Sequence, residues 1–89
     1  MTLAEVHIAS CVAYAQPGAM EAAIRAIVTS GIGEVPRADE RGRMVVLIER
    51  SSAAEVLDAI DAIRALEGVL AVHLAYQHGE PEEELQESP

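Results

Sequence analysis

The order of apolar and polar residues along the chain predicts four strands. Residues 5–15 and 67–76 alternate with a period of two, and residues 43–49 are apolar on both faces. Residues 34–38 form a shorter stretch that contains Pro36. Because proline cannot donate to a central ladder, we expect residues 34–38 at a sheet edge, whereas residues 43–49 are typical of a central strand.

Two segments with apolar residues at helical spacing separate these strands. The first begins at Pro17, a residue favoured at the first helical position, and ends near Gly31. Ser52 and Glu55 form a capping box at the start of the second, which ends at Gly68. The order is β-α-β-β-α-β, and right-handed crossovers place both helices on one face of a four-stranded antiparallel sheet. The sequence therefore predicts an α+β fold of the ferredoxin-like kind.

The alternation also suggests which side chains the helices cover. In residues 67–76 the bulky side chains share one face and the small ones the other, and we expect the bulky set of each strand to meet the helices. In residues 43–49, Glu49 favours the open side. The residues expected to point outward, with Glu5, His7 and Glu49 at the margin, are Ala9, Cys11, Ala13, Val45, Leu47, Ala71, His73 and Ala75.

An exposed patch with an apolar centre and a polar rim is typical of a binding or dimer surface. Small side chains in its centre would form a trough that accepts a partner helix. The pattern alone leaves three interpretations open, namely a partner-binding surface, a sheet-to-sheet homodimer and an alanine-rich surface without a partner.

Composition restricts the location and the partners. The 89 residues suffice for one domain, and a single cysteine excludes an internal disulfide and suits a reducing compartment. A net charge of -9 and only two aromatic residues argue against nucleic acid. The sequence has neither an apolar run of membrane-spanning length nor a secretory signal, so we expect a cytoplasmic protein that does not insert into membranes.

Five acids and no base fall in residues 79–89, which predicts a domain at 1–78 and a disordered acidic tail at 79–89.

No residue pattern predicts catalysis or a metal site. The spacing of His7, His73 and His78 along the sequence is not that of metal ligands, and Cys11 has no evident base. Acylphosphatases share the topology, but they use an asparagine, and this chain contains none. We therefore expect no enzyme activity, no cofactor and no bound metal.

Four segments together resemble one known family. They are HIASCV at 7–12, VVLIE at 45–49, IDAIR at 60–64 and EGVLAVHLAY at 67–76, and they are similar to the NapD family, the assembly chaperones of periplasmic nitrate reductase. The resemblance implies a ferredoxin-like fold, a cytoplasmic location and no catalysis. It also implies binding of the twin-arginine signal peptide of the catalytic subunit, which delays export until the molybdenum cofactor is inserted.

A receptor for such a peptide needs carboxylates for the two arginines beside a surface for the apolar segment. We expect Glu5 or Glu49 to pair with an arginine and His7 or His73 to hydrogen-bond the peptide. The residues expected to receive the apolar segment are Ala9, Cys11, Val45, Leu47, Ala71 and Ala75. We expect a monomer or a weak homodimer. The alternative function is a ferredoxin-like regulatory domain that senses a small ligand or dimerises.

Overall fold

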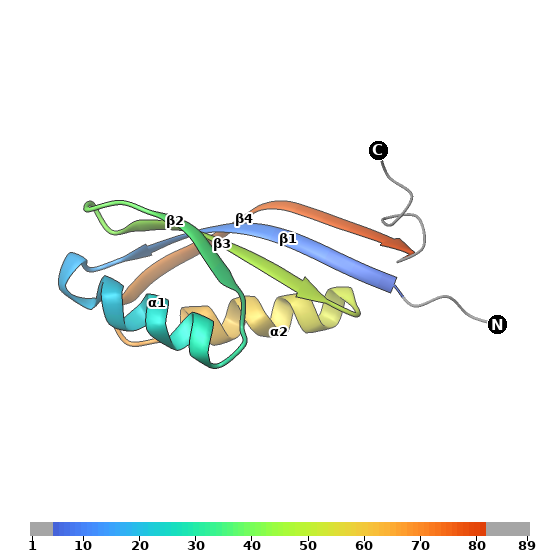
Figure 1. The fold of residues 1–89 in the computed structure, drawn as a ribbon, viewed down its shortest axis with the longest axis horizontal. Helices are drawn as coiled ribbons and strands as arrows, with labels where there is room; N and C mark the ends of the chain where they lie inside the picture. Colours follow the sequence, from blue (N-terminus) through green and yellow to red (C-terminus); the bar gives the residue numbers. More distant parts are fainter. Residues whose placement is uncertain (1–4, 82–89) are drawn as a thin grey trace.

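The computed structural model describes the backbone of residues 5–81 and the side chains of residues 6–75. Two helices lie on one face of a four-stranded antiparallel sheet with strand order β2-β3-β1-β4 (Figure 1). This arrangement confirms the predicted ferredoxin-like fold. In chain order the elements are β1 (Glu5–Ala15), the 3-10 turn η1 (Pro17–Ala19), α1 (Met20–Thr29), β2 (Glu34–Ala38), β3 (Arg43–Arg50), α2 (Ala53–Arg64) and β4 (Val69–Pro81).

Local sequence signals account for the element ends, with two differences from expectation. Pro17 begins a 3-10 turn, and the α-helix itself starts three residues later. Ser52 caps α2 by accepting the backbone N–H of Glu55 at 3.2 Å, as predicted, but the Glu55 carboxylate accepts from Ser51, one residue before the cap, at 3.1 Å. Gly68 has φ 85°, and a side chain there would collide with Ala19, so the loop after α2 requires glycine.

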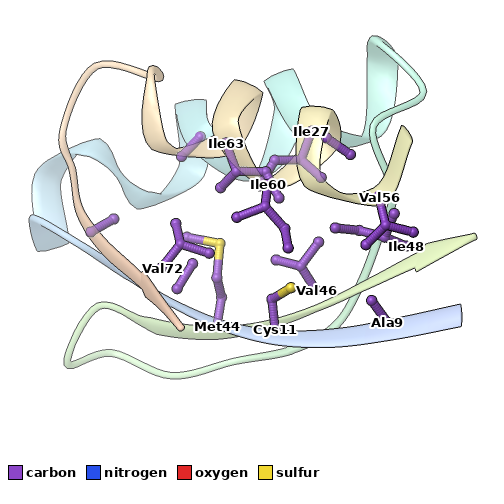
Figure 2. Packing of buried hydrophobic residues seen from close by; sticks show 14 residues of the cluster. Ala9, Cys11, Ile27, Met44, Val46, Ile48, Val56, Ile60, Ile63 and Val72 are labelled. Atoms are coloured by element: carbon purple, nitrogen blue, oxygen red, sulfur yellow. The ribbon is translucent and has the colours of Figure 1, made fainter. Parts of the chain in front are cut away.

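The prediction for the faces of β1 is wrong. Ala9 and Cys11 are fully buried, and Figure 2 shows their side chains pointing from β1 toward the helices. Ala13 is likewise fully buried, at the position opposite Met44. β1 lies in the middle of the sheet, so its helix-facing side chains lie beneath the isoleucines that project from α1 and α2. Small residues at these positions of β1 leave room for the side chains of Ile27, Ile60 and Ile63. Bulky residues at the same positions would overpack the core.

The faces of β3 follow the prediction. Met44, Val46 and Ile48 are buried beneath the helices. Val45 is half-buried, and Leu47 and Glu49 are exposed on the other side. The preference of Glu49 for solvent therefore identified the correct face, although the strand is apolar on both.

In β4 the prediction holds only for part of the bulky set. Val72 is buried, but Leu70 and Leu74 are 65% and 44% exposed. β4 is an edge strand, and its pairing with β1 shifts between Ala15 and Tyr14 and again between Cys11 and Ser10. These irregularities break the alternation, so neither leucine is covered as fully as the sequence pattern suggested.

β4 also extends beyond the predicted domain boundary. Its last pair joins Pro81 to Glu5, so the boundary expected at residue 78 falls inside the strand. The rest of the predicted acidic tail, residues 82–89, lies outside the described residues.

The burial of Cys11 predicts slow chemical modification. Burial raises the pKa of the Cys11 thiol, and the charge of Arg64 opposes that shift less strongly. Because the thiolate is the nucleophile, we expect iodoacetamide at pH 8 to modify the folded protein slowly and the denatured protein fast, as followed by mass spectrometry. The Cys11 thiol keeps its proton to a higher pH in the folded state than in the unfolded state. The free energy of unfolding should therefore fall as pH rises from the ordinary thiol pKa through the raised pKa of the folded state. Equal modification rates for folded and denatured protein would place Cys11 on the solvent side.

Candidate functional site

The side of the sheet away from the helices, which we call the open face, has an apolar centre formed by Ile8, Val12, Val45 and Leu47. In the β1–β3 register Val12 lies opposite Val45, and Leu47 lies opposite Ser10. All of these side chains are at least partly exposed. The centre is therefore built from the bulky side chains of β1, and not from the small ones that the sequence pattern assigned to it.

One corner of the open face contains an aromatic contact. The rings of Tyr14 and His73 meet edge to face, with centroids 5.9 Å apart and an interplanar angle of 73°. The register of β4 on β1 places His73 opposite Val12 and Ala71 opposite Tyr14, so both β4 residues lie on the open face. His73 thus has a defined position beside the apolar centre.

The open face has an acidic end, formed by Glu34 and Glu49, that borders the apolar centre. Glu49 lies opposite Ile8, and Glu34 of β2 lies opposite Leu47. These four residues line a hollow of about 350 Å³ together with Gly31, Gly33, Ile48 and Arg50.

The arginine beside this hollow forms no ion pair with the two acids. The Arg50 guanidinium donates to the carbonyls of Gly31 and Ile32 at 3.0 and 2.8 Å and to the Glu49 carbonyl at 2.8 Å. Among the described side chains, neither Glu34 nor Glu49 has a basic group at ion-pair distance. Both carboxylates can therefore accept an incoming cation.

The opposite end of the open face is basic and is formed by Arg37 and Arg43. Here Arg37 lies opposite Val45, and Arg43 lies opposite Tyr14. A hollow of about 680 Å³ is lined by Val12, Tyr14, Pro36, Arg37, Ala38, Asp39, Arg43 and Val45.

Asp39 offsets part of the positive charge at this end. Its carboxylate lies 3.3 Å from the Arg43 guanidinium and accepts the backbone N–H groups of Arg41 and Arg43 at 2.9 and 3.2 Å. The Arg43 amide is the main cause that lowers the pKa of Asp39, so this side chain is ionised at neutral pH. No described acid pairs with Arg37 in the same way.

The structure places half of the ten predicted site residues on the open face. Val45, Leu47, Glu49, Ala71 and His73 do lie together on the open face.

The other five predicted residues are not assigned to the open face. Ala9 and Cys11 face the helices with no exposed surface, which makes their predicted place on the open face wrong. His7 alternates in phase with Ala9 and so belongs to the helix side of β1 as well. Ala75 is exposed but falls at the irregularity of β4, out of register with Ala71 and His73. For Glu5 only the backbone is described.

Several residues of the open face were not predicted from the sequence. A usable signal for β1 was present, because a run of small residues at every second position of a central strand indicates the side that two helices cover closely. No comparable signal existed for β2. The missed residues are Ile8, Ser10, Val12, Tyr14, Glu34, Arg37 and Arg43.

The described residues include neither a metal-binding group nor a membrane-spanning helix. They contain no group of three or more side chains arranged to hold a metal ion. None of the helices in the described part of the chain is long and apolar enough to cross a bilayer.

The arrangement defines a ferredoxin-like domain with one sheet face covered by helices and the other open, apolar in its centre and charged at both ends. Residues 6–81 match the family described as NapD protein, and the chain belongs to the NapD family. A similar solved structure is the solution structure of the E. coli Tat proofreading chaperone protein NapD. It is 28% identical, the match covers 94% of this chain and 87% of that one, and the TM-score is 0.74. The search of curated protein sequences gave no match.

Proposed function

We propose that this protein is a proofreading chaperone for twin-arginine translocation, which binds the twin-arginine signal peptide of the periplasmic nitrate reductase catalytic subunit on its open face. Membership of the NapD family and the 28% identity to the E. coli Tat proofreading chaperone support this function. The observation that carries the proposal is the apolar centre beside two carboxylates that pair with no described basic side chain, because the peptide combines an apolar segment with two arginines.

In this function the protein acts by binding, in the cytoplasm, and performs no catalysis. While this protein is bound to the signal peptide, the peptide cannot engage the export machinery, and binding lasts until the molybdenum cofactor has been inserted into the catalytic subunit. The net charge of -9 favours a cationic partner and increases its rate of encounter.

The corrected faces change the proposed contacts. The apolar segment of the peptide lies on the apolar centre and on Ala71, while Glu49 and Glu34 accept the arginines and His73 hydrogen-bonds the peptide backbone. Glu5 precedes His7 by two residues on β1, so the alternation that removes His7 gives no support for Glu5 as a contact on the open face. Ala9, Cys11 and His7 are no longer among the proposed contacts, since they belong to the helix side of β1.

Calorimetry with synthetic peptides tests the proposal. The twin-arginine peptide should bind saturably, and its Lys-Lys variant should bind more weakly, because lysine cannot form the bidentate contact that a guanidinium makes with a carboxylate. A scrambled peptide of the same composition is the control for charge and hydrophobicity. Equal binding of the twin-arginine and scrambled peptides would overturn the proposal.

The open face also favours a second candidate role, a sheet-to-sheet homodimer, because Tyr14 and Leu47 are large and well exposed there. If the peptide and a second copy compete for this face, sedimentation should show a weak dimer that the peptide converts to a monomer. A stable dimer that persists with saturating peptide would favour a dimerising regulatory domain.

A further inference from the structure

The charges of the open face are ordered along the strands. On the flank formed by β2 and β3, Glu49 and Glu34 lie at one end, and Arg37 and Arg43 lie at the other. The apolar centre lies beside this series. The open face therefore has an electrostatic direction as well as an apolar surface.

The distance between the two charged ends matches a short peptide segment. Glu49 and Arg43 are six residues apart on β3, which corresponds to roughly 20 Å at about 3.3 Å per strand residue. A helix of about 13 residues, or an extended segment of about six, covers that length. An apolar segment of this size can touch both ends of the open face at once.

The charges that give the face its direction differ in how far they are neutralised. Glu34 and Glu49 have no described ion pair, and Arg50 beside them is occupied by backbone carbonyls. At the basic end Asp39 pairs with Arg43, so Arg37 supplies most of the available positive charge. The acidic end consequently provides the stronger attraction for a cation.

We propose that this order of charges fixes the direction in which the signal peptide lies, with its arginines at Glu34 and Glu49 and its downstream end toward Arg37 and Arg43. The inference rests on the proposed function. In the opposite direction the peptide arginines would lie beside Arg37, where like charges repel. If the bound segment is helical, its dipole acts in the same sense, since its positive N-terminus meets the carboxylates and its negative C-terminus meets the guanidiniums.

Paramagnetic NMR measures the direction. A nitroxide is attached to either end of the twin-arginine peptide, and the broadening of backbone amide signals is compared between Glu49 and Arg43 in the intact protein. We expect the label at the arginine end to broaden the Glu49 region and the downstream label to broaden the Arg43 region. The reverse pattern, or equal broadening at both ends from either label, would overturn the inference.

This test separates the two hypotheses. If the twin-arginine peptide causes no saturable shifts at all, the proposed function fails. If it binds saturably but in the reverse direction or in both, only the direction is wrong.

A charge exchange provides a second test. The variant E34R/R37E/R43E/E49R keeps the net charge of the chain but inverts the order of charges on the open face. The exchange variant should bind the peptide in the opposite direction and so reverse the broadening pattern. The control E21R/R25E exchanges an exposed pair on α1 and should change neither affinity nor direction. An unchanged broadening pattern in the folded exchange variant would show that these charges do not set the direction.

Discussion

Replacing Cys11 by arginine is expected to unfold the domain, whereas replacing its neighbour Ser10 by arginine is expected to leave it folded. Cys11 has no exposed surface and packs beneath the helices, while Ser10 lies opposite Leu47 on the open face. An unpaired buried charge costs about 3–5 kcal/mol, and overpacking adds about 1–3 kcal/mol. A domain of this size has a free energy of unfolding of about 4–13 kcal/mol. Circular dichroism during heating should show no cooperative transition for C11R, or one at a much lower temperature.

Two further observations complete this experiment. Cys11→Ser keeps the side-chain volume nearly constant and should fold with a moderate loss of stability, which separates the effect of the charge from the loss of the thiol. S10R should retain the wild-type transition but lose affinity for the twin-arginine peptide, since a long charged side chain would stand in the apolar centre. A stable C11R variant together with an unfolded S10R variant would show that the faces of β1 are reversed.

The element order was predictable because its signals are local. Ser52 and Glu55 mark the start of α2, Gly68 marks its end, and Pro36 assigns β2 to the sheet edge. Each of these signals acts within a few residues and does not depend on distant packing. The resulting order and a preference for right-handed crossovers are sufficient to give the fold.

The faces of β1 were not predictable from hydrophobicity alone. Alternation separates Ala9 and Cys11 from Ile8 and Val12, but it does not state which set the helices cover. Side-chain size was the additional signal, because the helix side chains require volume above the middle of the sheet and the small residues of β1 leave that volume. In β3 the charge of Glu49 correctly indicated which face of the strand is exposed to solvent.

The charged ends of the site were hidden for a different reason. β2 is only five residues long, contains a proline, and shifts its register on β3 between Glu34 and Arg37. Alternation over so few residues does not show that Glu34 and Arg37 share a face with Leu47 and Val45. The ordered charges become visible only when the register of β2 on β3 is known.

Leu47→Arg is expected to weaken binding of the twin-arginine peptide about 100-fold without unfolding the domain. Leu47 is 38% exposed in the apolar centre and lies beside Glu34, so an arginine there both fills the contact surface and competes for the carboxylate. Loss of a central contact residue typically costs about 2–4 kcal/mol, and each 1.4 kcal/mol is about a tenfold change in affinity.

Leu57→Arg is the matched control for this variant. Leu57 is 54% exposed on α2, the helix that covers the opposite face of the sheet, and the substitution changes size and charge in the same way. Calorimetry should give a dissociation constant within about twofold of wild type for L57R, and both variants should retain the wild-type unfolding transition. If L57R loses as much affinity as L47R, the peptide does not bind on the open face, or the loss reflects charge alone. A loss confined to L47R is the result that assigns the binding surface to the bulky side of β1 and β3, since only that side contains Leu47.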